Sequence, residues 1–450
     1  MRRDSSSVST GGILDIAVIG SGISGLSCAW LLSTRHRVTL FEAEHRLGGH
    51  SHTVTALDVA VDTGFIVYND ATYPNFAALL RHLGVITKPS EMSFAVSLDD
   101  GRLEYSGSGC SGLFAQGRNV ISPRFWRMLR DIVRFYREAP LDAPRLGTTT
   151  LDNYLDTAGY SAAFRNDHLY PMAAAIWSTP AAEIGSYPAA GFIRFCQTHG
   201  LLKLSGRPIW RTVDGGSRAY VQRMAEAIPR ILSGQPIEAI RRHSNGVEVS
   251  SQAGGCPRHF DHVVIATHAD QALRMLADAS ADERRVLGAF RYVDNDAVLH
   301  SDPNLMPSRR KVWSSWNYLS CGAGDGKQLA VTYWMNRLQG IDEATPLYVT
   351  LNPHRHIRDG RIVRRLRYRH PSFNTSAMAA QEELWSLQGM GNTWFCGSYF
   401  GAGFHEDGLQ AGLAVAEALG DTRRPWTVAD ESGRIHVHEL ATTAADTEAA

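Results

Sequence analysis

The chain has 450 residues, of which 44% are hydrophobic and 20% charged, and this composition excludes a disordered or fibrous protein. Its 45 basic and 45 acidic residues balance, so the charge gives no reason to expect nucleic-acid binding. The six cysteines lack metal-ligand spacing, and no run approaches the ~20 apolar residues that cross a bilayer. We therefore predict a cytoplasmic protein of two intertwined domains, with no metal site.

The first predicted element is a buried parallel strand at 16–19, which is wholly apolar and leads directly into a glycine-rich turn. Gly20, Gly22 and Gly25 have the GxGxxG spacing. The first glycine permits a tight turn, the second lets the backbone approach a pyrophosphate, and the third lets helix and strand pack closely. The turn therefore predicts a dinucleotide site.

A helix at 26–33 and a strand at 38–41 complete the predicted unit. The helix N-terminus would present free N–H groups to the two phosphates. Glu42 ends the strand 22 residues after the first glycine, where a carboxylate can bind ribose hydroxyls. The predicted contacts with the dinucleotide are Gly20, Gly22, Ile23, Ser24, Gly25, Glu42 and Ala43.

The segment after this unit has an RxGG pattern, formed by Arg46, Gly48 and Gly49. The pattern resembles the flavoprotein version of the motif, and the resemblance implies FAD rather than NAD. His50 stands where relatives often carry arginine, so it either contacts flavin or is an ordinary hydrogen-bonded histidine.

A hairpin is predicted over 53–65, with a turn signal that includes Thr63 and Gly64. In flavin oxidases of this type such a turn runs beneath the isoalloxazine ring; the alternative is a plain hairpin corner. An amphipathic helix is predicted next, at 72–84.

An arginine-rich helix is predicted within 118–145. Its apolar face carries Phe125, Leu129, Ile132, Val133 and Tyr136, and another face carries Arg127, Arg130, Arg134 and Arg137. Either the helix lies on an anionic membrane surface, or its basic face is simply solvated. The helical stretch at 152–201 is more apolar than packing on a sheet requires. Its large side chains either wall a substrate cavity or pack on one another, and they include Met172, Trp177, Phe192 and Phe195.

A strand pair at 235–252 leads into a buried strand at 262–267. This hairpin resembles the element that closes over the adenine in related flavoproteins, which implies a backbone contact near Ile237. Thr267 and His268 end the buried strand at the sheet edge where ligands bind. Antiparallel strands at 290–370 predict a second domain, in which His300 either faces the flavin or lies at the surface.

A strand at 394–396, a loop and a helix at 408–419 follow near the C-terminus. Together with the N-terminal motif, they resemble the C-terminal FAD signature of the flavin amine oxidase, protoporphyrinogen oxidase and phytoene desaturase superfamily. The resemblance implies that the helix N-terminus stabilises negative charge on the flavin. Ser398 departs from the aspartate that is usual there for the ribityl chain. The implied contacts are Gly397, Ser398, Phe404, His405, Gly408 and Leu409, with Phe404 against the ring and His405 either contacting flavin or capping.

A closer resemblance covers almost the whole chain and is carried by DTGFIVYND, TYPNF, DGGSRAYV, VLHSD, LMP and GFHEDGLQAGLAVAEAL. These segments resemble bacterial FAD-dependent oxidoreductases that are similar to the N-terminal part of plant cyclopropane-fatty-acid synthases. The resemblance implies a lipid acyl substrate and a lipid methyltransferase as partner. A location at the inner face of the membrane is the alternative that the arginine-rich helix leaves open beside the cytoplasmic prediction.

The predicted fold is α/β, with a two-dinucleotide-binding-type (Rossmann-like) FAD domain and a mixed-sheet plus helical substrate domain. The FAD domain is discontinuous and is assigned to 13–70, 205–275 and 385–425. The substrate domain is assigned to 71–204 and 276–384, and 1–12 and 427–450 are assigned to flexible tails.

The leading functional hypothesis is an FAD-dependent oxidoreductase that oxidises, desaturates or isomerises an acyl chain. Its candidate catalytic residues are His50, His300, Phe404 and His405. One alternative is an amine oxidase that releases hydrogen peroxide. Such enzymes commonly place a lysine near the flavin, and none of the four lysines here is in a matching strand. The other alternative is a flavin-binding partner of a methyltransferase without its own turnover.

Overall fold

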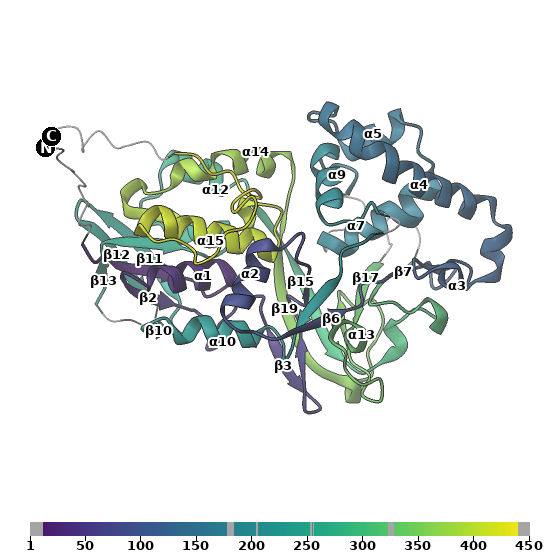
Figure 1. The fold of residues 1–450 in the computed structure, drawn as a ribbon, viewed down its shortest axis with the longest axis horizontal. Coiled ribbons are helices and arrows are strands. Elements are labelled where there is room, and N and C mark those ends of the chain that lie inside the picture. Colours follow the sequence, from purple (N-terminus) through teal and green to yellow (C-terminus); the bar gives the residue numbers. More distant parts are fainter. Residues whose placement is uncertain are drawn as a thin grey trace, which may run out of the picture.

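The computed structural model describes residues 12–177, 184–203, 206–252, 254, 256–322 and 328–439. Two halves lie side by side in it (Figure 1). One contains α1 (Ile23–Leu32), α15 (His405–Gly420) and a parallel sheet, and the other contains a larger mixed sheet and a group of helices. The predicted α/β fold with a Rossmann-like domain and a mixed-sheet domain is confirmed.

The parallel sheet has five strands in the order β10-β2-β1-β14-β20, and every neighbouring pair in it is parallel. Its central strand forms at the apolar run predicted from the sequence, and Ile16, Ala17 and Val18 are fully buried there. The strands are β1 (Asp15–Ile19), β2 (Arg37–Phe41), β10 (Arg230–Leu232), β14 (His262–Ile265) and β20 (Thr393–Phe395).

Helices α1 and α15 lie next to each other over this sheet (Figure 1). A Cβ atom added to Gly412 would lie 2.2 Å from the carbonyl oxygen of Ser24, so only glycine permits this approach. The two helices therefore pack closely at this position. The contact brings the N-termini of the two helices, which follow sequence segments nearly 400 residues apart, to one site.

Three smaller sheets surround this core. An antiparallel sheet of β11 (Ile237–His243), β12 (Gly246–Ser251) and β13 (Arg258–Phe260) forms the predicted adenine-side hairpin. The other two are a hairpin and a three-stranded sheet between the halves. They contain β3 (Thr53–Ala56) and β4 (Val59–Asp62), and β5 (Val67–Tyr68), β9 (Trp210–Val213) and β6 (Thr87–Ser90).

The second half is built on a seven-stranded sheet in the order β19-β15-β18-β17-β16-β7-β8. All neighbouring pairs are antiparallel except β16 with β7, which is parallel. The strands are β7 (Phe94–Leu98), β8 (Leu103–Ser106), β15 (Arg291–His300), β16 (Trp316–Cys321), β17 (Gln328–Trp334), β18 (Tyr348–Leu351) and β19 (Ile362–Ser372).

Helices α4, α5, α7 and α9 gather at the far side of this half (Figure 1). The longest is α4, which runs from Pro123 to Asp142 and is capped by Ser122 accepting a hydrogen bond from the Phe125 N–H. Among the described residues, the remaining α-helices of four or more residues are α2 (Pro74–His82), α3 (Cys110–Leu113), α5 (Leu151–Thr157), α7 (Tyr170–Trp177), α9 (Ala189–Thr198), α10 (Arg218–Glu226), α11 (Ala269–Met275), α12 (Ala281–Leu287), α13 (Met335–Gln339) and α14 (Thr375–Glu383).

Two predicted domain boundaries differ from the observed arrangement. Helices α12 and α14, which were assigned to the substrate domain, lie beside α15 in the FAD half (Figure 1), and α2 also packs on α15. The boundary at 427 is too early, because Ile435 is buried and Arg434 pairs with Asp407. A polar composition does not reveal such packing, since ion pairs contribute to it. Among the described residues, no helix combines the length and apolarity needed to cross a membrane.

Candidate functional site

One large cavity of about 1360 Å³ is lined by both halves of the molecule. Ligand pockets usually measure roughly 300–1,000 Å³, so this volume suits a cofactor together with a substrate. One part is lined by the two helix N-termini and the strand ends of the parallel sheet, and the other by apolar side chains of the second half. We call these parts the cofactor chamber and the substrate chamber.

The glycine-rich turn shapes the cofactor chamber. Gly20 has φ +100°, a conformation that other residues rarely adopt, and a Cβ atom on Gly25 would lie 1.8 Å from the Gly20 oxygen. A Cβ on Gly22 would meet nothing within 4 Å, so the backbone at the start of α1 borders open space. The site thus offers N–H groups, a positive helix end and room for a pyrophosphate.

Glu42 is held in this chamber by its neighbours. One carboxylate oxygen accepts hydrogen bonds from the backbone N–H and the hydroxyl of Ser21, at 2.9 and 2.5 Å, and the other accepts one from the Glu44 N–H at 2.9 Å. The acid therefore lies at the end of β2, beside the glycine turn, as the motif predicts. Its remaining lone pairs suit the hydroxyls of a ribose.

Most of the predicted cofactor-binding residues line this cavity. They are Gly20, Gly22, Ile23, Ser24, Glu42, Ala43, Gly48, Gly49, His50, Thr63, Gly64, Ile237, Thr267, Gly397, Ser398, Phe404 and His405. Four others are not part of the lining and lie next to it, namely Gly25, Arg46, Gly408 and Leu409. Arg46 donates to the Gly49 oxygen at 2.7 Å and so fixes the RxGG turn. These residues, gathered from six segments, fit FAD.

His300 is the predicted residue that the structure places elsewhere. It is fully buried and does not line the cavity; its Nε2 lies 2.7 Å from Thr350 Oγ1, and its Nδ1 accepts from the Asp302 N–H. Both sequence interpretations, a flavin contact and a surface histidine, are therefore wrong. The strand alternation indicates a buried side chain. That side chain packs beside Thr350 and Tyr348 of the neighbouring strand β18 and does not face the cavity.

His50 belongs to a group of aromatic rings at the cavity wall. Its ring lies 5.2 Å from that of Tyr368, 5.4 Å from His370 and 6.1 Å from His268. Burial lowers the pKa of His50 to about 4, and those of His268 and His370 to about 3, so all three rings are neutral near pH 7. His50 Nε2 has no partner within the described chain, which leaves a polar atom for a ligand.

His405 stands at the start of α15 and is held by a buried chain of hydrogen bonds. Its Nε2 lies 2.9 Å from the Tyr220 hydroxyl, which donates to Ser51 Oγ at 2.7 Å. Its ring stacks on Phe65 at 3.8 Å, and burial lowers its pKa to about 3. The side chain does not cap the helix; Asp407 accepts from the Phe404 N–H and does so instead. His405 is thus a fixed, neutral wall residue.

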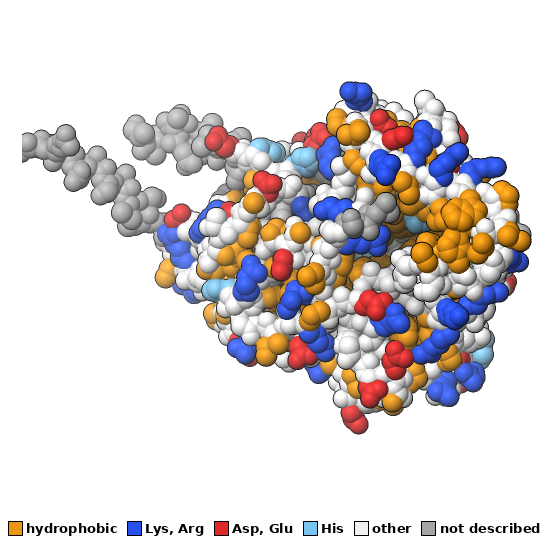
Figure 2. All heavy atoms as spheres, turned by 45° about the vertical axis from the view of Figure 1, so that its right-hand side comes forward, with side chains coloured by type: hydrophobic (Ala, Val, Ile, Leu, Met, Phe, Trp, Pro, Cys, Tyr) orange, Lys and Arg blue, Asp and Glu red, His pale blue; other side chains and the backbone are white. Residues whose placement is uncertain are grey.

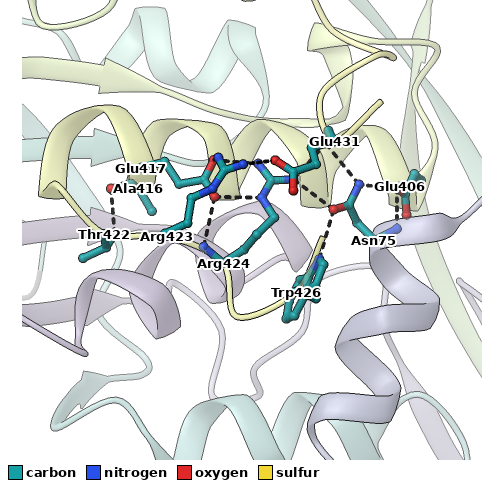
Figure 3. Close-up of polar contacts among 9 residues, drawn as sticks. All are labelled: Asn75, Glu406, Ala416, Glu417, Thr422, Arg423, Arg424, Trp426 and Glu431. Carbon is teal, nitrogen blue, oxygen red and sulfur yellow. Dashed lines mark hydrogen bonds and ion pairs between the residues drawn. The ribbon is translucent and has the colours of Figure 1, made fainter. Parts of the chain in front are cut away.

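The N-terminus of α15 is anchored by a network that joins three segments (Figure 3). Glu406 accepts hydrogen bonds from the backbone N–H groups of Asn75 and Phe76 at the start of α2, at 3.0 and 2.9 Å. Arg424 pairs with Glu417 and donates to Asn75 Oδ1 at 2.9 Å, and the Trp426 N–H donates to the same oxygen. The chain after α15 therefore folds back and fixes the helix whose N-terminus borders the cofactor chamber.

The substrate chamber is walled by apolar side chains from seven elements. Four of these side chains lie on one face of helix α4, so the apolar face of this helix points into the chamber. The chamber is lined by Phe94, Leu129, Ile132, Val133, Tyr136, Met172, Ala175, Ile176, Phe195, Trp316, Tyr333 and Leu351. The predicted cavity residues Met172 and Phe195 are present; Phe192 is buried elsewhere, and the side chain of Trp177 lies outside the described residues.

His168 places an imidazole in the wall of this largely apolar chamber. His168 belongs to a π-helical turn, Arg165–Leu169, a feature that often marks functional sites. The Tyr105 hydroxyl donates its proton to the backbone carbonyl oxygen of Asp167 at 2.8 Å. It must therefore accept a hydrogen bond from His168 Nδ1 at 3.0 Å. The proton therefore resides on Nδ1, and Nε2, which has no described partner, is an acceptor.

Several wall residues were not predicted, namely Tyr105, His168, Trp316, Tyr368 and His370. His268 is not among them, because the sequence places it with Thr267 at the carboxyl edge of a buried strand, where ligands of such sheets bind. The others come from strands and a helical turn whose distant partners no local pattern reveals.

The parallel sheet, the two glycine-supported helix N-termini and the acidic ribose contact define an FAD-binding protein of the two-domain flavoenzyme class. A comparison with protein families agrees, because the profile described as flavin containing amine oxidoreductase matches residues 23–300. The chain belongs to this family, and FAD is its cofactor.

Curated relatives are more distant. The "Putative flavin-containing monoamine oxidase AofH" of Mycobacterium tuberculosis is 28% identical over 273 residues, which cover 56% of this chain and 57% of that protein. The flavin-containing amine oxidase A of Sus scrofa is 31% identical over 153 residues, 32% of this chain and 27% of the relative. The chain thus spans little more than half the length of AofH and about a quarter of the length of amine oxidase A.

Solved structures share the whole fold at low identity. Putrescine oxidase bound to putrescine aligns over 91% of this chain and 99% of its own, with a TM-score of 0.66 and 16% identity. A conjugated-linoleic-acid-producing fatty acid isomerase from P. acnes aligns over 90% and 98%, also with a TM-score of 0.66 and 16% identity. One fold thus serves an amine oxidase and a fatty acid isomerase, so the fold does not distinguish their substrates.

Proposed function

We propose that this protein is an FAD-dependent oxidoreductase that oxidises, desaturates or isomerises a lipid acyl chain. The observation that carries the proposal is the composition of the substrate chamber. Its described walls hold no lysine and no carboxylate, and the acids of the whole cavity, Glu42, Glu44 and Glu238, all belong to the cofactor chamber.

An ammonium substrate would have to leave water and enter this chamber without a carboxylate to pair with. Such a transfer is costly unless the charge is compensated, whereas each buried methylene of an acyl chain contributes about 0.8 kcal/mol. A neutral amine could contact aromatic rings such as Tyr333 and Trp316, and this keeps the amine oxidase as the second candidate. The chamber favours an acyl chain over an amine.

FAD supplies the chemistry of hydride transfer when it is bound. The chain's own residues bind the cofactor through the glycine turn, direct the N-terminus of α15 toward it, and exclude water with apolar walls. The neutral rings of His50 and His405 add no positive charge at the wall. We propose His50, Phe404 and His405 as the residues that contact the reacting centre.

The resemblance to bacterial oxidoreductases that are similar to plant cyclopropane-fatty-acid synthases supports the same substrate class. The segments that carry it include the cavity turn at Thr63 and Gly64 and the start of α15. A lipid methyltransferase acts on the same acyl chains, so we propose such an enzyme as a functional partner. A flavin-binding partner without turnover remains the third candidate.

Anaerobic titration of the yellow holoprotein separates these candidates. We expect phospholipid with unsaturated acyl chains to bleach the oxidised flavin spectrum, and putrescine or benzylamine to leave it unchanged. Because an isomerisation returns the hydride and restores the oxidised spectrum, the lipid is also recovered and its double bonds are located by mass spectrometry. Bleaching by amines, followed by release of peroxide when oxygen is admitted, would select the amine oxidase, and no change with any compound would select the partner without turnover.

A further inference from the structure

We propose that the segment from α3 to the first turns of α4 is a docking surface for an anionic phospholipid bilayer. We call this surface the α4 patch and define it by Val120, Ile121 and Trp126 with the arginines Arg118 and Arg127. The proposal concerns a surface that binds a membrane, and it does not depend on the catalytic activity proposed above.

Three large apolar side chains of the patch are exposed. Ile121 has 82% of its surface exposed, Trp126 51% and Val120 50%. The Trp126 N–H donates to the Val120 oxygen at 2.7 Å, and the indole ring leans on Phe114 at 5.6 Å. The polar end of the indole is therefore satisfied within the patch, and what remains toward solvent is a fixed apolar surface. Clustered apolar groups of this kind mark interaction sites.

The patch has a large excess of positive charge. Residues 107–137 contain six arginines and one acidic residue, Asp131. Three of the arginines pair with carboxylates, namely Arg124, Arg130 and Arg134. Arg118 and Arg127 are exposed and form no ion pair with a described carboxylate. Apolar side chains flanked by free arginines complement an anionic lipid surface, where each arginine contributes roughly 1 kcal/mol.

The patch also lies next to the cavity. Helix α4 carries Trp126 at its exposed start, and the following turns of the same helix line the substrate chamber with Leu129 and Val133. The exposed lining residues Gly107, Ser108 and Arg207 show that the cavity reaches the surface near α3. Figure 2 shows hydrophobic side chains gathered beside a hollow on this face. A bilayer docked on the patch would bring acyl chains to the opening.

Flotation with lipid vesicles tests the proposal, using the full-length yellow protein. We expect binding to vesicles of phosphatidylcholine with phosphatidylglycerol, and much weaker binding to phosphatidylcholine alone. An Ile121→Ser/Trp126→Ser variant and an Arg118→Glu/Arg127→Glu variant should each lose at least about tenfold in partitioning. Matched controls are Leu57→Ser/Met390→Ser and Arg223→Glu/Arg241→Glu, which change the same kinds of exposed side chain elsewhere and should bind normally.

Retention of bound FAD shows that each variant is folded. The proposal is overturned if the unmodified protein ignores anionic vesicles, or if the patch variants and their controls bind equally. It is also overturned if light scattering shows a dimer that the Ile121→Ser/Trp126→Ser variant dissociates, because the patch would then be an interface between copies of the chain.

Discussion

The two chambers of the cavity obtain their specificity from different parts of the polypeptide. The cofactor chamber is built from backbone, with Gly20, Gly22 and Gly25 setting its shape and helix ends supplying its charge. The substrate chamber is built from side chains of distant strands and helices. A backbone site tolerates little change and serves one cofactor, whereas side chains can be exchanged without altering the fold. This difference explains how an amine oxidase and a fatty acid isomerase share one architecture.

The largest expected effect comes from Gly22→Glu in the cofactor chamber. The added side chain fits without a clash, because a Cβ there meets nothing within 4 Å, but its carboxylate would occupy the space for the phosphates. We expect complete loss of bound FAD, read from the absorbance of the purified protein, with a retained circular dichroism spectrum. Gly360→Glu, at another open glycine, is the control and should stay yellow. A yellow Gly22→Glu protein would disprove the assignment of the chamber.

Val133→Asp should impair substrate binding in the substrate chamber without affecting the cofactor chamber. An acyl chain that enters the chamber would remove water from the new carboxylate, which costs roughly 2 kcal/mol or more. The value of kcat/KM for lipid should therefore fall at least about thirtyfold, while FAD is retained. Leu141→Asp places the same charge on the exposed face of α4, where 74% of the side chain is exposed, and should have no effect. Improved turnover of an amine by Val133→Asp would support a chamber that selects by charge. Unchanged lipid kinetics would contradict its proposed role.

The buried histidines at the cavity wall, His50, His268 and His370, should make the stability of the fold sensitive to acid. His370 has a pKa of about 3 in the fold and about 6.5 in the unfolded chain, so the unfolded chain binds the extra proton between these values. Its contribution to stability is therefore full above pH 6.5 and declines as the pH falls, by about 1.4 kcal/mol per pH unit. His370→Gln should reduce the slope of the unfolding free energy against pH by that amount, measured by urea denaturation between pH 5 and 6. The exposed His259→Gln variant should leave the slope unchanged.

The smallest expected effect is at Ser398, where the superfamily's aspartate is missing. The hydroxyl offers the cofactor one neutral hydrogen bond, and its removal in Ser398→Ala should cost about 1 kcal/mol, or roughly fivefold in FAD affinity. Isothermal titration of the apoprotein with FAD measures this change. An effect of a hundredfold or more would show that Ser398 does much more than donate one bond.

The same division explains what the sequence could reveal. The glycine turn, Glu42 and the start of α15 were predictable because each motif is local and is dictated by one ligand. The walls of the cavity depend on pairings between distant strands, such as β15 with β19. This pairing brings His370 to the cavity wall, and no local sequence pattern around His370 indicates that position. His300 shows the same limit, since strand alternation indicates an inward side chain but not which interior it enters.

The C-terminal segment was misjudged for a related reason. Its polar composition predicted a flexible tail from 427, yet Arg434 is largely buried against Asp407 and Tyr73. Ion pairs and hydrogen bonds, together with the buried Ile435, hold this segment against α15 (Figure 3). Hydrophobic periodicity does not report such contacts, so only the structure shows that the segment supports the cofactor chamber.

The most direct test of the proposed acyl-chain chemistry is mass spectrometry of phospholipid after incubation with the holoprotein, with the FAD-free Gly22→Glu protein as the blank. We predict that acyl chains lose two hydrogen atoms or acquire a moved double bond only with the holoprotein. Lipid recovered unchanged, while an amine in the same mixture is converted to its aldehyde, would contradict the account.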